Sequence, residues 1–228
     1  MKPNVVHKMK VSEWMENIFD ILYLSFTLTA ALIYFDLFNS QIEILLYGFL
    51  ALILGAGDGF HLIPRILVNA QGKKEDSDHW LGNGQKITSI TMTIFYVILF
   101  QIWQILYPDL PSPLIVTILV YALAVLRIVI CFFPQNEWTS GKENLKWSLY
   151  RNIPFLIMGV LIAVLFIWSG LTYDDGFRWM FLAIILSFAC YLPVTLLAKK
   201  YPKVGMLMIP KTCAYIWMLV MGFSLIWG

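Results

Sequence analysis

The chain has 228 residues, of which 60% are hydrophobic and only 13% are charged, and its mean hydropathy is +0.75. A soluble domain is roughly half apolar and a quarter charged, so this composition excludes a soluble globular enzyme and indicates a protein that folds in lipid. The formal net charge of +2, with basic residues spread along the chain, gives no support for a nucleic-acid partner.

Seven apolar stretches are each long enough to cross a hydrocarbon core of about 30 Å, because a helix rises about 1.5 Å per residue. We therefore predict an all-α fold, in which residues 1–228 form a single transmembrane domain with short polar connections. The spans are expected near residues 17–38, 42–64, 86–107, 113–133, 152–172, 177–198 and 204–227. Acidic residues interrupt the N-terminal region and no small-residue cleavage site follows, so we expect the first span to be retained.

The basic residues predict how these spans are oriented. If the chain crosses the membrane seven times, all but one of the 16 Lys and Arg residues lie on the side of the N-terminus, and the exception is Arg178. Cytoplasmic connections carry the excess of Lys and Arg. The N-terminus is therefore expected in the cytoplasm and the C-terminus on the opposite side. We expect a multi-pass protein of the plasma membrane.

Cysteines and histidines give no sign of a disulfide framework or of a metal centre. Cys131, Cys190 and Cys213 lie inside apolar runs, where cysteine behaves as a small hydrophobic residue. The only histidines, at positions 7, 61 and 79, are scattered along the chain, whereas a zinc site needs several ligands on facing helices. We expect neither a metal nor another cofactor.

The second span carries the strongest candidate for chemistry. Asp58, His61 and Arg65 follow one another at helical spacing, so they share one face near the cytoplasmic end of that span. An ionisable group inside a membrane is costly and is a candidate functional group by default. Asp58 is therefore the first catalytic candidate, as a general acid or base, and His61 is a second. Arg65 is a candidate for binding an anionic group of the substrate.

Further polar residues lie at the same depth on other spans. Asp20 on the first span is a third catalytic candidate. The remaining candidates for substrate binding, on the third, fifth and seventh spans, are Lys86, Arg151, Lys211 and Tyr215. Together they predict a polar pocket in the cytoplasmic half of the bundle, although acidic and basic stripes would also serve to hold the helices in register. Arg127 is expected to snorkel to the interface and receives no role.

The segment Gly57-Asp58-Gly59-Phe60-His61-Leu62-Ile63-Pro64-Arg65, followed by Leu81-Gly82 and by residues 89–96, resembles the YhhN-type lysoplasmalogenase family. Residues 151–154 and 158–168 resemble a later helix of that family, so that the resemblance covers about half of the chain. It implies a polytopic enzyme that hydrolyses the vinyl-ether bond of a lysolipid, at a pocket open to the membrane. The implied partners are membrane lipids and the lysolipid substrate.

The chain departs from that family at defined points. Residues 187–193 contain no carboxylate where the family often has one, and residues 91–93 contain no histidine. The chain also has one span fewer than is usual in the family. A hydrolase that uses two carboxylates would then need Asp20 as the second one.

Three other functions remain open at the level of sequence. A carrier or channel for a small solute would use the same polar stripes, but the outer halves of the last three spans are almost purely apolar, which favours a closed pocket. A retinal protein is disfavoured, because Lys211 stands only about two turns into its helix and the third span offers no carboxylate counter-ion. The third alternative is an accessory membrane protein without chemistry of its own.

Overall fold

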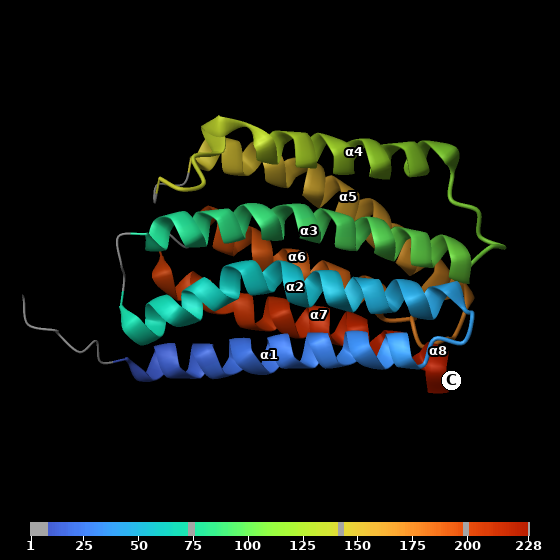
Figure 1. Cartoon of the computed structure of the whole chain (residues 1–228). Helices are drawn as coiled ribbons and strands as arrows, with labels where there is room; N and C mark the ends of the chain where they lie inside the picture. Colours follow the sequence, from blue (N-terminus) through green and yellow to red (C-terminus); the bar gives the residue numbers. More distant parts are fainter. Residues whose placement is uncertain (1–8, 73–75, 141–143, 198–200, 228) are drawn as a thin grey trace, which may run out of the picture.

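Seven long helices run side by side along one axis in the computed structural model, which describes residues 9–72, 76–140, 144–197 and 201–227 (Figure 1). The described residues form α1 (Val11–Asp36), α2 (Ile42–Gln71), α3 (Ser77–Leu106), α4 (Leu114–Phe132), η1 (Pro134–Asn136), α5 (Leu145–Thr172), α6 (Met180–Leu197), η2 (Pro202–Leu207), α7 (Met208–Gly222) and α8 (Ser224–Trp227). Seven helices, the last counted over Lys203–Trp227, are long and apolar enough to cross a membrane. The predicted all-α, polytopic membrane fold is thereby confirmed.

Several helices extend beyond the spans predicted from hydropathy. The span expected to end near residue 64 continues as α2 to Gln71, and the one expected to begin near residue 86 begins as α3 at Ser77. Hydropathy marks the length that crosses lipid, whereas backbone hydrogen bonds continue into the interface. A helix of 30 residues is about 45 Å long and exceeds a hydrocarbon core of about 30 Å.

Consecutive helices alternate in direction, so the start of α1 lies at the same end as the ends of α2, α4 and α6 (Figure 1). We call this the basic end, because the sequence places nearly all Lys and Arg residues on this side. The opposite end, with Arg178, is the far end. Helix α2 packs between α1 and α3 and also contacts α7, while α5 lies between α4 and α6.

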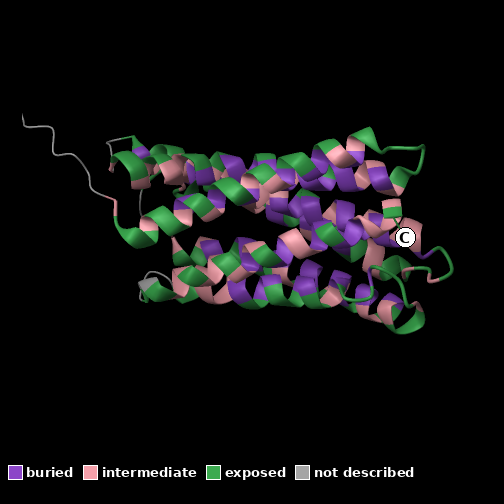
Figure 2. Cartoon of the chain, turned by 90° about the horizontal axis from the view of Figure 1, so that it is seen from below, coloured by how far each residue is buried: buried purple, intermediate pink, exposed green. Residues whose placement is uncertain are grey.

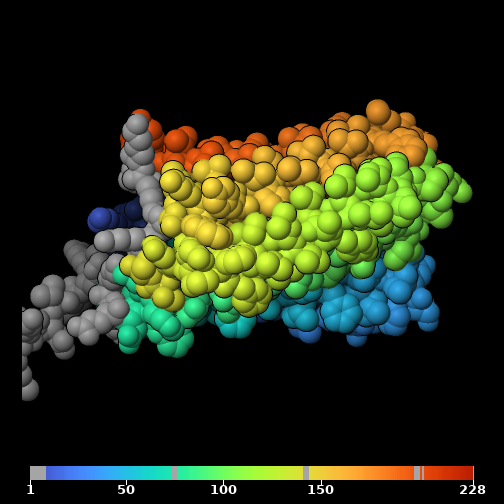
Figure 3. All heavy atoms as spheres, turned by 90° about the horizontal axis from the view of Figure 1, so that it is seen from above, coloured from blue at the N-terminus to red at the C-terminus, as the bar shows by residue number. Residues whose placement is uncertain are grey.

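Apolar side chains are divided between the inside of the bundle and its outer surface. Figure 2 shows buried residues along the facing sides of the helices and exposed residues along the outside. Fully buried aromatic rings fill the far half, among them Tyr34, Tyr47, Phe100 and Trp103. Large hydrophobic residues such as Leu22, Ile118 and Leu171 are exposed, as expected of helices whose solvent is lipid. Helix α4, in green and yellow, runs along the outer face seen in Figure 3.

Small residues allow α2 and α3 to approach closely, as is usual between membrane helices. A Cβ added at Gly84 of α3 would collide with the backbone of Phe60 and His61 in α2, which cannot move out of the way as a side chain can. A Cβ added at Gly59 of α2 would meet its nearest neighbour, Ile63, at 3.8 Å, an ordinary contact.

Gly84→Ala is therefore expected to lower the free energy of unfolding by about 1–3 kcal/mol, the usual cost of overpacking. Gly59→Ala serves as the matched control and should be neutral or stabilising by up to about 1 kcal/mol, since alanine is the better helix former. Unfolding in mixed detergent, followed by circular dichroism, measures both. Equal stability of the two variants would contradict the close contact of α2 with α3.

Candidate functional site

A hydrogen-bonded Tyr–Asp pair lies in the basic half of the bundle. The Tyr23 hydroxyl of α1 donates to Oδ2 of Asp58 in α2 at 2.7 Å. Only 1% of Tyr23 and 8% of Asp58 are exposed, so the pair is buried between the two helices. A phenol that donates to a carboxylate stabilises the ionised carboxylate and fixes its orientation.

Two further ionisable groups lie around this pair. Asp20, one turn before Tyr23, is close enough that its charge interacts with that of Asp58, and its Oδ2 atom is buried without a hydrogen-bond partner among the described residues. Lys211 of α7 is 7% exposed, and its charge also interacts with Asp58. Its Nζ atom lies 5.3 Å from the ring centroids of both Tyr191 and Tyr215. Asp20, Tyr23, Asp58 and Lys211 are called the Asp58 cluster below.

His61 and Arg65 extend from this cluster toward the basic end. His61 interacts electrostatically with both Asp58 and Lys211, and its buried Nδ1 atom has no hydrogen-bond partner in the part of the chain that the structure describes. The guanidinium of Arg65 forms an ion pair with Glu16 of α1. This pairing occupies the arginine that the sequence suggested for substrate binding.

Two of the predicted substrate-binding residues lie away from Asp58. Nζ of Lys86 lies over the ring of Phe132 in α4, 4.6 Å from its centroid. Arg151 stacks on the Trp138 ring at 4.3 Å and donates from Nη1 to Oδ1 of Asn136 at 3.1 Å, so it anchors the α4–α5 connection. The structure thus brings six of the predicted residues together and leaves these two on the α3–α4–α5 side.

The prediction made for Arg127 from the sequence is wrong. This arginine does not snorkel to the interface, because only 1% of it is exposed. Its Cζ atom lies 3.4 Å from the ring centroid of Phe155 in α5, and the buried Nε and Nη1 atoms have no hydrogen-bond partners within the described ranges. The reason is the rotation of α4 about its axis, which turns this side chain into the bundle and leaves neighbours such as Leu126 facing lipid. The position of Arg127 in the middle of a predicted span was the feature of the sequence that could have indicated a buried, functional charge.

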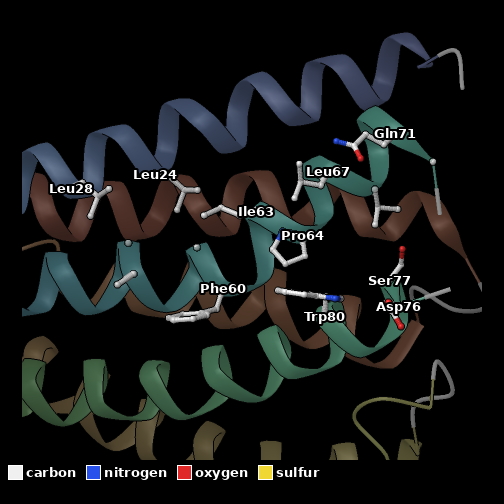
Figure 4. Close-up of a pocket in the computed structure, with 15 residues that line it drawn as sticks. Leu24, Leu28, Phe60, Ile63, Pro64, Leu67, Gln71, Asp76, Ser77 and Trp80 are labelled. Atoms are coloured by element: carbon white, nitrogen blue, oxygen red, sulfur yellow. The ribbon is translucent and has the colours of Figure 1, made fainter. Parts of the chain in front are cut away.

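A largely apolar groove of about 690 Å³ lies on the lipid-facing side of α1, α2 and the start of α3 (Figure 4). Leu24 and Leu28 of α1, Phe60 and Ile63 of α2, and Trp80 of α3 point into it. Its polar end, with Gln71, Asp76 and Ser77, lies at the basic end. Gly55 and Gly59, on either side of Asp58 in sequence, line the groove, while Asp58 itself faces the interior. The backbone of α2 therefore separates the groove from the Asp58 cluster.

Within the described ranges, no three His, Cys, Asp or Glu side chains come together in a way that would hold a metal ion. The chemistry available in this region is that of carboxylates, an imidazole, an ammonium group and phenols.

Comparison with protein-family models, with curated proteins and with solved structures finds no match for this chain. Its assignment as a multi-pass integral membrane protein follows from the length and hydropathy of the helices themselves.

Proposed function

We propose that this membrane protein hydrolyses a lysolipid, with Asp58 and Asp20 as its acid–base pair. The observation that carries the proposal is the pair of interacting carboxyl groups inside the bundle, one fixed by Tyr23 and the other with a free oxygen. Two neighbouring carboxyl groups share a proton, so that one can donate while the other accepts. Such a pair is costly in a membrane, which makes it a candidate functional site.

The resemblance to lysoplasmalogenases suggests the vinyl ether of a lysolipid as the bond that is cleaved. Asp20, as the protonated member, would deliver its proton to the β-carbon of the vinyl ether, which leaves a positively charged oxocarbenium carbon. Asp58 would take a proton from the water that attacks this carbon. The resulting hemiacetal then gives its hydroxyl proton to Asp20, while the glycerol oxygen takes the proton held by Asp58 and leaves as an alcohol. A fatty aldehyde remains, and both carboxyl groups are back in their starting states.

The groove of α1, α2 and α3 suits the hydrocarbon chain of such a lipid. It faces the membrane and is lined mainly by apolar side chains. Contact with Asp58 requires the chain to pass between α1 and α2, close to Leu24 and Gly55. Thr27 packs tightly against Gly55 at this point, so α1 must shift for the lipid to reach the carboxylates.

Buried aromatic side chains fill the far half of the bundle, and this supports a closed pocket rather than a pathway for a solute. Trp103 is completely buried and donates from Nε1 to the carbonyl oxygen of Leu165 at 3.0 Å and to Oγ of Ser169 at 3.1 Å. Tyr34, also completely buried, donates to the carbonyl oxygen of Leu219 at 2.6 Å. These rings tie α3 to α5 and α1 to α7 across the region that a transported solute would have to cross.

The purified full-length protein should release a fatty aldehyde from alkenyl lysophosphatidylethanolamine in detergent, with products followed by mass spectrometry. Acyl and alkyl lysolipids, tested in parallel, report on the bond that is cleaved. If only the acyl lipid is cleaved and a fatty acid is released, the protein hydrolyses an ester bond and the proposed cleavage of an ether bond is wrong. If no lipid of the panel turns over and proteoliposomes take up a small solute, the hydrolase proposal is wrong.

A further inference from the structure

Arg127 is a buried cation with hydrogen-bond donors that lack an acceptor among the described residues. A guanidinium carries five N–H donors in a fixed planar arrangement. In this chain the side chain is 1% exposed, and Nε and Nη1 donate to none of the described residues. The Phe155 ring, 3.4 Å from Cζ, covers one face of the guanidinium but accepts no hydrogen bond from its edge. Nε and Nη1 therefore have no acceptor among the residues that the structure describes.

The charged and phenolic groups around Arg127 do not supply the missing anion. The groups whose charges act on it most are Tyr191, Cys131, Tyr215 and Arg151, and none of these is a carboxylate. The charge of Arg127 also interacts electrostatically with that of Lys211. Lys211 makes no ion pair within the part of the chain that the structure describes. Two cations thus lie near one another in a low-dielectric interior, where an unpaired charge costs free energy that a bound anion would remove.

We propose that Arg127 and Lys211, with the hydroxyl of Tyr215, bind a phosphate group inside the bundle. Arginine presents a planar fork that matches two phosphate oxygens, and lysine adds a compact point charge. Tyr215 is 2% exposed and has Lys211 beside its ring, so its hydroxyl lies in the same buried region. Arg127 of α4 lies over the ring of Phe155 and Lys211 of α7 lies over the ring of Tyr191. These two ring centroids are 6.1 Å apart, which brings the two cations into the same region.

This phosphate is the headgroup phosphate of the lysolipid, an assignment that rests on the proposed function. Lys211 interacts with both Asp58 and Arg127, so it connects the carboxyl pair to the arginine. A lysophospholipid would then have its headgroup phosphate at Arg127 and its ether bond at the carboxyl pair. Binding of phosphate itself does not depend on hydrolysis and is measured separately.

The test measures binding by native mass spectrometry and by thermal shift, in an Asp58→Asn background that leaves the lipid intact. Lysophosphatidylethanolamine should bind at least tenfold more weakly to the Arg127→Met variant, while monoacylglycerol, which has no phosphate, should bind equally to both. Arg127→Lys keeps the charge without the fork and should bind with intermediate affinity. Arg178→Met is the matched control, because Arg178 is exposed at the far end and paired with Asp174, and it should bind as the parent does.

A third probe, inorganic phosphate, separates the two sources of this chemistry. If lysophosphatidylethanolamine stabilises the parent and phosphate alone does not, the ligand is the lipid headgroup; if phosphate alone stabilises it, the site is supported but the lipid assignment is wrong. Equal lipid affinity of the parent and Arg127→Met would overturn the site. If Arg127→Met does not fold, the Arg127→Lys variant decides: an affinity for lysophosphatidylethanolamine equal to that of the parent would also overturn the site. If the wild-type protein turns over no lysolipid but its Arg127-dependent phosphate binding is retained, the proposed hydrolysis is wrong and the phosphate site still stands.

Discussion

Replacing Asp58 with asparagine is expected to lower the rate of lysolipid hydrolysis by about 100-fold to 10,000-fold, the usual contribution of a general acid or base. Asparagine has the same shape, and its Oδ1 atom can accept the hydrogen bond that Tyr23 donates to Asp58 at 2.7 Å. It cannot take a proton from water. Initial rates of aldehyde release measure the loss, and thermal unfolding in detergent should show a nearly unchanged midpoint.

The far end of the bundle offers a matched control. Tyr107 donates to Oδ2 of Asp175, also at 2.7 Å, so a second Tyr–Asp pair exists away from the proposed site. Burial and the hydrogen bond to Asp175 raise the pKa of Tyr107, which keeps the proton on the phenol at neutral pH. Asp175→Asn should retain full turnover. If Asp58→Asn unfolds the protein, Asp58 has a structural role. If Asp58→Asn keeps full activity, as Asp175→Asn should, Asp58 is not an acid–base group. Either result contradicts the proposed mechanism.

The number of spans and the face shared by Asp58, His61 and Arg65 could be predicted from the sequence. Both follow from local physics, because the length of an apolar run determines whether it crosses lipid, and helical spacing determines which residues share a face. The hydrogen bond from Tyr23 to Asp58 could not be predicted from the sequence. Helical spacing puts Tyr23 one turn after Asp20, but it does not show that this face of α1 packs against α2.

The partners of the basic residues could not be predicted, because they depend on how each helix is rotated against its neighbours. Arg127 packs on Phe155 in α5, and Arg151 stacks on Trp138 in the α4–α5 connection. Neither contact leaves a periodic signal. Lys86 was assigned to the polar pocket because of its depth, yet its Nζ atom lies over Phe132 of α4. Depth along a helix can be read from sequence, whereas direction around the bundle axis requires the packed structure.

Trp103→Ala is expected to lower the free energy of unfolding by about 3–5 kcal/mol, the range for truncating a fully buried aromatic residue. The indole is completely buried, and its Nε1–H group joins α3 to α5 through the carbonyl of Leu165 and the hydroxyl of Ser169. Trp103→Phe keeps most of the ring and loses these hydrogen bonds, so it should cost about 1 kcal/mol. Trp14→Ala, at a side chain that is 57% exposed, is the control and should change stability little. Unfolding titrations in mixed detergent measure all three.

The same variant distinguishes a closed pocket from a solute pathway. In a closed pocket Trp103 is part of the core, and its removal leaves a dry apolar cavity that weakens the fold without opening the bundle. Proteoliposomes with Trp103→Ala should then be as impermeable to small solutes as those with the wild-type protein. In a carrier or channel the same ring would block the pathway, and its removal would raise solute flux while stability changed little. Raised flux without a loss of stability would therefore show that the polar cluster at Asp58 lies on a route through the membrane.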